Sequence, residues 1–169
     1  LYGDDGIRHR VSDSQAKVLV TNAANKDRVD PSLVEHVLIL DDELLQSGDA
    51  SFDVVDTAAD DPAQLYYSSG TTGLAKGIIH AHRSLLPAGQ GQREVVGLAA
   101  GELSFATSKL FFAYALEHGL LGPLAIGATA ILEPNWPDAE TALALVARHR
   151  PATFFSVPTF YRSLLALGA

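Results

Sequence analysis

The chain contains neither cysteine nor methionine among its 169 residues. Without cysteine it can form no disulfide and offers no thiolate as a nucleophile or metal ligand. No apolar run approaches the roughly 18 residues that a membrane-spanning helix needs, and no signal peptide is visible. We therefore expect a cytoplasmic protein with no membrane partner. The absence of methionine and the opening Leu1-Tyr2-Gly3 lead us to expect a piece of something longer.

Basic residues are also scarce, and the net charge is −8. Eleven acidic residues lie between Asp27 and Asp61, where Arg28 is the one base. A general nucleic-acid binder needs a basic face to neutralise phosphates, so we expect no nucleic-acid partner. The rest of the chain holds nine acids and eleven bases. An anionic ligand would therefore meet less repulsion there.

The second feature of the sequence is an alternation of strand-like and helix-like segments. We predict strands at 16–21, 34–40, 64–68, 77–80, 103–107, 127–132 and 152–157, and helices at 7–14, 83–96, 110–124, 137–150 and 159–167. Segment 41–61 is expected to be a surface connection. This alternation is typical of an α/β fold, layered, with a mainly parallel sheet and flanking helices. The predicted core comprises Val18, Leu19, Ile39, Leu65, Ile131, Phe154 and Val157.

The most informative segment is Tyr66–Gly77 (YYSSGTTGLAKG), directly after a predicted strand. From Ser68 onward it holds three glycines, four hydroxyls and one lysine. Glycines let backbone N–H groups approach a ligand closely, and successive N–H groups form an anion-binding concavity. Hydroxyls add donors, and Lys76 adds a mobile positive charge. The composition therefore predicts a polyphosphate-binding loop.

Two common phosphate loops do not fit this spacing. A Walker loop needs G-x-x-x-x-G-K-[ST], whereas the fifth residue after Gly70 is Ala75 and Lys76 precedes Gly77. The dinucleotide fingerprint G-x-G-x-x-G also fails, because the glycines here are spaced three and four apart.

Residues 67–77 instead resemble the signature loop of the adenylate-forming, AMP-binding superfamily, Tyr-(Ser/Thr)-Ser-Gly-(Thr/Ser)-Thr-Gly-x-Pro-Lys-Gly. One of the eleven positions departs: Ala75 stands where proline is usual, a change expected to affect loop rigidity alone. The resemblance implies catalytic roles for Lys76 and Thr72. It also implies that ATP phosphates are bound by Ser68, Ser69, Gly70, Thr71, Thr72, Gly73 and Lys76. His80 and His82 also fit the family, and we expect them to shape the loop.

A second match narrows the resemblance to the acyl-CoA synthetase branch. Residues 109–114 (KLFFAY) and 121–132 (LGPLAIGATAIL) are similar to the corresponding passages of benzoate–CoA ligases. This resemblance implies that Phe112, Ala113 and Tyr114 line the pocket for an aryl carboxylate. The alternative is that all three are ordinary core residues at a helix start. After Tyr114 the sequence Ala115–His118 replaces a Gly-Leu-Gly-Asn-like stretch, which leaves the acid undetermined.

Several motifs of the superfamily do not occur in this sequence: Tyr-Gly-x-Thr-Glu, Thr-Gly-Asp, and the C-terminal domain with its lysine. We therefore expect residues 1–169 to be one fragment of the large N-terminal AMP-binding domain, a Rossmann-like subdomain, with the C-terminal domain absent and the fragment alone inactive. The resemblance implies that the parent enzyme uses ATP, Mg²⁺ and CoA to convert a carboxylic acid, which we expect to be aromatic, to an acyl adenylate and then an acyl-CoA. We expect no metal ligands from this chain. A homo-oligomer stays open. The alternatives are an adenylation domain serving a carrier protein, or an inert interaction module.

Overall fold

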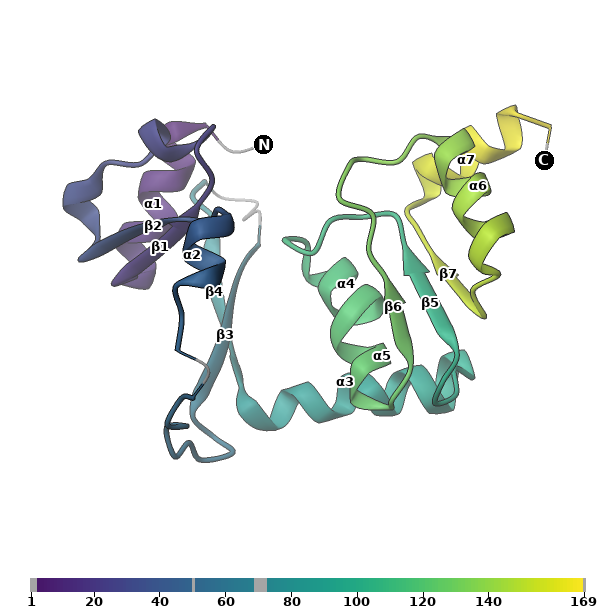
Figure 1. The fold of residues 1–169 in the computed structure, drawn as a ribbon, viewed down its shortest axis with the longest axis horizontal. Coiled ribbons are helices and arrows are strands. Elements are labelled where there is room, and N and C mark those ends of the chain that lie inside the picture. The colour runs from purple at the N-terminus through teal and green to yellow at the C-terminus, as the bar shows by residue number, and fades with distance from the viewer. Residues whose placement is uncertain (1–2, 50, 69–72, 169) are drawn as a thin grey trace. The chain divides into compact units, whose positions relative to one another are not determined.

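The computed structural model describes residues 3–49, 51–68 and 73–168, which form two compact units, Leu1–His82 and Arg83–Ala169 (Figure 1). The first unit contains, in chain order, α1 (Asp4–Ser14), β1 (Val18–Thr21), the short 3₁₀ helices η1 (Lys26–Arg28) and η2 (Pro31–Leu33), β2 (His36–Ile39), α2 (Asp42–Gln46), β3 (Pro62–Ser68) and β4 (Lys76–Ala81).

The second unit begins at Arg83, within the 3₁₀ helix η3 (His82–Ser84). It contains α3 (Leu85–Gly91), the π-helical turn η4 (Gln92–Val96), β5 (Leu103–Ala106), α4 (Ala113–Leu116), the π-helical turn η5 (Glu117–Leu121), α5 (Gly122–Ala125), β6 (Thr129–Ile131), α6 (Ala139–His149), β7 (Thr153–Phe155) and α7 (Pro158–Ala166). Among the described residues no helix combines the length and the apolar character needed to cross a bilayer.

The described strands fall into three small sheets. In the first unit β1 pairs in parallel with β2, and β3 pairs antiparallel with β4. In the second unit the order is β6-β5-β7, all parallel. The predicted α/β class with parallel strands and flanking helices is confirmed. The one antiparallel pair arises because residues 69–75 join β3 to β4 directly, whereas each parallel pair is joined through helical segments.

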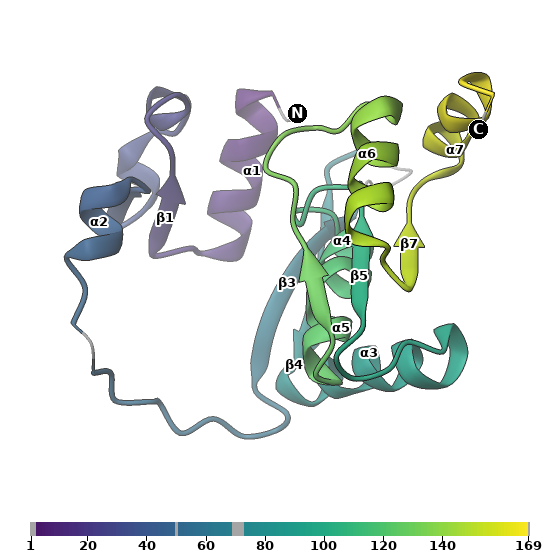
Figure 2. The same ribbon diagram turned by 45° about the vertical axis from the view of Figure 1, so that its right-hand side comes forward.

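The core of the second unit surrounds its central strand. Phe105 and Ser104 of β5 are fully buried, and the Phe105 ring lies 5.6 Å from that of Phe154 on β7. Figures 1 and 2 show α4 and α5 running alongside this sheet, with α6 and α7 grouped at its β7 end. A buried strand flanked by parallel neighbours is the arrangement that the apolar runs of the sequence predict.

The predicted core is wrong: Leu19, Ile39, Ile131 and Phe154 are only half-buried, and the other three residues are exposed. Val18, Leu65 and Val157 are 47%, 38% and 42% exposed. Val18 and Leu65 lie in two-stranded sheets, which are too narrow for both faces to be covered, and Val157 caps the start of α7. The residues that are buried together instead include Leu98, Ile126 and Ala128 of the second unit.

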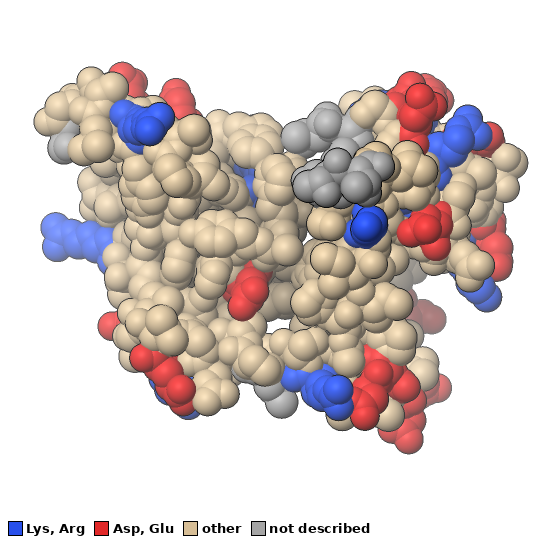
Figure 3. All heavy atoms as spheres, turned by 180° about the vertical axis from the view of Figure 1, so that it is seen from behind, with Lys and Arg blue, Asp and Glu red and all other residues tan. Residues whose placement is uncertain are grey.

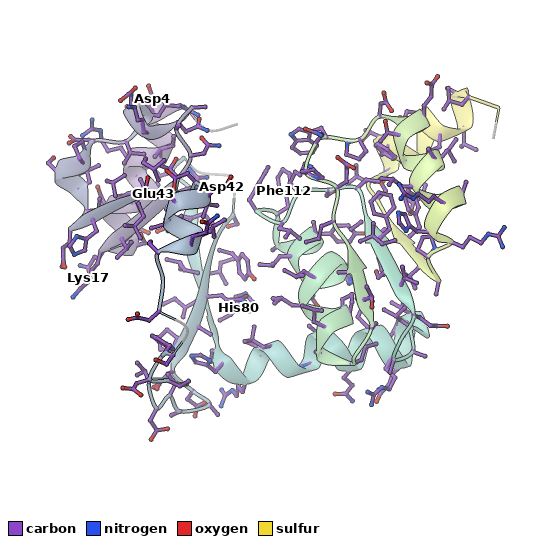
Figure 4. The ribbon with its side chains drawn as sticks, viewed as in Figure 1. Asp4, Lys17, Asp42, Glu43, His80 and Phe112 are labelled. Atoms are coloured by element: carbon purple, nitrogen blue, oxygen red, sulfur yellow. The ribbon has the colours of Figure 1, made fainter. Side chains whose placement is uncertain are left out.

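Helix α2 lies inside segment 41–61, where a plain connection was expected. Asp41 caps it, its Oδ1 accepting a hydrogen bond of 2.8 Å from the Leu44 amide, and Asp42 and Glu43 occupy the first turn (Figure 4). Acidic residues at these positions complement the positive end of the helix dipole. Asp41 followed by two acidic residues is therefore a helix start signal that was already present in the sequence.

The distribution of charged side chains reflects the scarcity of basic residues in the sequence. On the face drawn in Figure 3, the lysines and arginines of the described residues stand apart from one another, with neutral surface between them. The three ion pairs found between described residues, which include Lys17–Glu35 at 3.8 Å, are exposed. Exposed pairs of this kind stabilise a fold by about 0–1 kcal/mol each, so each unit is held together mainly by packing within it.

Helix α3 packs closely on α5, and this contact requires a glycine. A Cβ at Gly89 would lie 2.7 Å from the Ala125 Cβ and 3.2 Å from the Ile126 side chain. We predict that Gly89→Ala lowers the free energy of unfolding by about 1–3 kcal/mol, the usual effect of overpacking. Urea denaturation of the chain measures this change.

Gly91→Ala is the matched control, because Gly91 ends the same helix and a Cβ there would meet no atom within 4 Å. It should leave the stability unchanged or raise it by up to about 1 kcal/mol. Equal destabilisation by both substitutions would show that the α3–α5 contact is looser than described.

Candidate functional site

The predicted phosphate loop joins the two strands of the β3–β4 hairpin. Strand β3 ends at Ser68, β4 begins at Lys76, and these two residues are register partners across the antiparallel pair. The prediction that the loop leaves the end of a strand near Ser68 is confirmed. Ser69, Gly70, Thr71 and Thr72 lie outside the described residues. The hairpin thus brings Ser68 and Lys76 together at the base of the loop.

Lys76 is exposed at this base. Within the described part of the chain, its ammonium group makes no ion pair or hydrogen bond. Gly73, three residues earlier, has a φ of +131°, a conformation that a residue with a Cβ rarely adopts. A free cation beside a glycine-shaped turn is chemically suited to an anionic ligand.

Helix α1 anchors the other end of the loop. The Nε2–H of His9 donates a hydrogen bond of 2.7 Å to the Ala75 carbonyl, directly before Lys76. The hydroxyl of Tyr67 donates to Asp13 Oδ2 at 2.7 Å, and the Arg10 guanidinium lies 5.5 Å from the centre of the Tyr67 ring. Sequence patterns do not reveal these contacts, because they join residues more than 50 positions apart.

The environment of Tyr67 favours its protonated hydroxyl. Desolvation by burial raises the pKa of Tyr67, and its hydrogen bond to the Asp13 carboxylate raises that pKa further. The neutral phenol is therefore the donor in the link from β3 to α1.

Two further contacts hold the hairpin strands in place. Tyr66 on β3 meets His80 on β4 edge to face, with ring centres 5.1 Å apart (Figure 4). A Cβ at Gly77 would lie 3.0 Å from Leu65 Cδ1 and 3.5 Å from the Tyr67 ring. His80 therefore supports the hairpin strands, and the expected part of His80 and His82 in shaping the loop stays a prediction.

The predicted acid-pocket residues lie in the second unit, at the start of α4. Phe112 is the residue before the helix (Figure 4), and Ala113 and Tyr114 form its first turn. Phe112 is 41% and Tyr114 42% exposed, so neither is a core residue in the described structure. The Tyr114 hydroxyl donates weakly to the Ser156 carbonyl at 3.4 Å. Burial raises the pKa of Tyr114, and nearby Tyr161 adds to the shift.

An open cavity of about 750 Å³ lies beside these residues in the same unit. Its wall includes Phe111 and Trp136, whose ring centres are 6.1 Å apart, together with the side chain of Lys109. Lys109 donates to the carbonyls of Glu133 and Asn135 and thereby fixes the Trp136 segment. Phe112, Ala113 and Tyr114 do not contribute to this wall, so their role as pocket lining stays a prediction.

No three histidine, aspartate or glutamate side chains gather closely enough to hold a metal ion in the part of the chain that the structure describes. The backbone amide and ammonium N–H groups at the hairpin are hydrogen-bond donors, which suit an anion.

Comparison with known proteins decides the family. The model of the family described as "AMP-binding enzyme" matches residues 1–169. The chain belongs to the AMP-binding enzyme family. The phosphate-binding role of the segment from Ser68 to Lys76 stays a prediction.

Among curated relatives, benzoate–CoA ligase of Thauera aromatica is 35% identical over 179 residues, covering 98% of this chain and 34% of that protein. The 3-hydroxybenzoate–CoA/4-hydroxybenzoate–CoA ligase of Thauera aromatica is 51% identical over 120 residues, covering 71% of this chain and 23% of that protein. The resemblance to benzoate–CoA ligases predicted from the sequence is thus confirmed.

Solved structures of this family share the fold. A benzoate–CoA ligase from Burkholderia xenovorans LB400 superposes with a TM-score of 0.84 at 29% identity, covering 98% of this chain and 35% of that one. An anthranilate–CoA ligase in complex with anthranoyl-AMP gives a TM-score of 0.88 at 26% identity, with the same coverage. The chain spans between 23% and 35% of the length of these relatives.

The anchoring of the loop by His9 is open to test. We predict that His9→Ala increases amide hydrogen exchange along β4 by roughly twofold to tenfold, because one hydrogen bond contributes about 0.5–1.5 kcal/mol. Hydrogen-exchange mass spectrometry of peptides covering Lys76–Ala81 measures the effect.

His36→Ala provides the control, since His36 is exposed on β2 and its side chain makes no contact with the hairpin. Exchange along β4 should be the same in this variant as in the wild type. If His9→Ala also left it unchanged, the His9–Ala75 bond would not hold the loop.

Proposed function

We propose that the full-length protein carrying this chain uses ATP to convert an aromatic carboxylic acid to an acyl adenylate and then to an acyl-CoA. In this proposal the chain supplies the phosphate-binding loop and part of the acid pocket. The observation that carries it is the pairing of Ser68 with Lys76 at the two ends of a glycine- and hydroxyl-rich loop.

The hairpin geometry suits the triphosphate of ATP. Lys76 can place its charge on the β- and γ-phosphates, and the hydroxyls of Ser68, Ser69, Thr71 and Thr72 supply donors of adjustable direction. The glycines at 70 and 73 let backbone N–H groups contribute as well. Donors fixed before the reaction stabilise charge as it develops, and this is how a chain with no acid–base group in the loop contributes to catalysis.

The proposed reaction has two displacements. In the first, a carboxylate oxygen of the acid attacks the α-phosphorus of ATP, and the bond to pyrophosphate breaks. In the second, the CoA thiol attacks the acyl carbon, its proton is lost, and AMP leaves with the oxygen that joined it to the acid. Lys76 and Thr72 act in the first displacement, by neutralising the pyrophosphate as it departs. Bound with ATP, Mg²⁺ supplies further neutralising charge, and the described residues hold no site of their own for it.

Two observations support an aromatic acid. Relatives covering most of this chain act on benzoate and hydroxybenzoates, and a related structure holds anthranoyl-AMP. In the second unit, Phe112 and Tyr114 present partly exposed aromatic rings on either side of the small Ala113. Rings placed in this way can pack against an aryl group, and Ala113 leaves room for it.

A second candidate is transfer of the acyl group to a carrier protein instead of CoA. A p-hydroxybenzoic acid–AMP ligase of Mycobacterium marinum is 31% identical over 150 residues, covering 88% of this chain. Both candidates share the first displacement and the loop, so they differ only in the thiol that accepts the acyl group. Formation of aroyl-CoA by the purified full-length protein separates them. A cytoplasmic location, self-association, and the absence of nucleic-acid and membrane partners remain predictions.

We predict that Lys76→Ala in the full-length protein slows pyrophosphate release with an aromatic acid by roughly 10²–10³-fold, the usual effect of removing one preorganised donor. Thioester formation from supplied aroyl adenylate should change by less than about threefold, because no triphosphate is present in that step. Rapid-quench measurement of each step gives both values.

Lys26→Ala serves as the control, because Lys26 is exposed on η1 away from the hairpin. It should leave both steps as they are. Pyrophosphate release that is as fast in Lys76→Ala as in the control would contradict the assignment of the loop.

A further inference from the structure

A buried polar pair joins the two π-helical turns of the second unit. The Gln92 side chain on η4 is 1% exposed, and its Nε2 lies 2.6 Å from Nδ1 of His118 on η5. An amide nitrogen donates and does not accept, so Nδ1 of His118 is the acceptor. A neutral imidazole that accepts at Nδ1 carries its proton on Nε2. Gln92 therefore makes the Nε2 of His118 a hydrogen-bond donor.

The surrounding backbone is shaped to allow this contact. A Cβ at Gly122 would lie 2.6 Å from Gln92 Cγ, so the side chain of Gln92 occupies the space that a larger residue would fill. The hydroxyl of Ser104 on β5 donates to the His118 carbonyl at 3.3 Å and holds η5 against the sheet. Gln92 Oε1 is buried without a partner in the described structure. An apolar residue would avoid this unpaired acceptor, so packing alone does not account for a glutamine here.

The His118 ring lies in an aromatic wall next to the proposed acid pocket. It stacks on Phe155 with ring centres 4.9 Å apart and 15° between planes, and it meets Tyr114 at 4.8 Å. Tyr114 is one of the three residues assigned to the acid. The ring is half-buried, and its Nε2 has no hydrogen-bond partner among the described residues. The Nε2–H donor of His118 thus lies beside aromatic side chains and is unpaired within the described residues.

We propose that His118 determines which aromatic acid is used, by donating from Nε2–H to a hydroxyl oxygen on the substrate ring. Gln92 is the positioning residue that fixes the tautomer and orientation of the imidazole. This inference rests on the proposed function and refines its substrate class to a hydroxylated aromatic acid. A site built to bond a substrate hydroxyl discriminates against the analogue that lacks it, because its own polar group is then left unpaired. Benzoate should accordingly be the poorer substrate.

The test compares benzoate, 3-hydroxybenzoate and 4-hydroxybenzoate as substrates of the full-length protein. We expect the wild type to favour one hydroxybenzoate over benzoate by at least about tenfold in kcat/KM. The double substitution His118→Phe with Gln92→Leu retains a ring against Phe155 and leaves no amide unpaired. It should reduce that preference to within about threefold of unity, chiefly through a higher KM for the hydroxybenzoate.

Gln92→Leu alone tests positioning. With the tautomer no longer fixed, the KM for the hydroxybenzoate should rise about threefold to tenfold more than the KM for benzoate, while the kcat values change together. Gln90→Leu is the matched control: the same substitution on α3, at an exposed residue that bonds only Glu94 among the described side chains. In this control, the ratio of kcat/KM for the hydroxybenzoate to kcat/KM for benzoate should equal that of the wild type.

Three results would overturn the inference: a wild type without preference for a hydroxybenzoate, a double variant that keeps the preference, or equal loss with benzoate and hydroxybenzoate in both variants. The last result would assign the pair to packing. A variant that melts well below the wild type would be assayed at a temperature at which it stays folded. Its ratio of kcat/KM for the hydroxybenzoate to kcat/KM for benzoate would then still test the inference. A wild type that activates none of the three acids overturns the proposed function together with this inference.

Discussion

The antiparallel pairing of β3 with β4 is the constraint on which the proposed chemistry depends. Because Ser68 faces Lys76 across the hairpin, the loop between them must begin and end at one place. The His9 bond to Ala75 holds the exit of the loop. In the proposed function, donors fixed before the reaction need little rearrangement when charge appears, and this is the basis of electrostatic catalysis.

The second unit places aromatic and polar groups beside a buried sheet. Its parallel strands bury Phe105 and Ser104, and the helical segment after β5 carries Phe112 to Tyr114 at its start. The π-helical turn η5 ends at Leu121, two residues before Pro123, which lacks an N–H for the helical ladder. His118 lies in this turn, where it contacts Gln92 and Phe155.

Local signals predicted much of this structure, and long-range contacts account for what was missed. The glycine- and hydroxyl-rich motif correctly predicted a strand end at Ser68, and the helix predicted at 137–150 corresponds to α6, where Asp138 Oδ1 accepts a hydrogen bond from the Thr141 amide. His9 and Asp13 could not be found in this way, because nothing near them in sequence indicates a partner on the hairpin. The predicted burial of Val18 and Leu65 was wrong, because an apolar strand pattern does not reveal how many neighbouring strands the sheet will have. The roles of Ser69 to Thr72 rest on the motif alone.

The most direct test of the central claim follows an oxygen atom. The full-length protein would be given ATP, CoA and an aromatic acid labelled with ¹⁸O in both carboxylate positions. If the hairpin supports attack of the carboxylate on the α-phosphorus, the AMP formed will carry one labelled oxygen, the thioester will keep the other, and pyrophosphate will be unlabelled. Release of ADP and phosphate, or of AMP without label, would contradict the account.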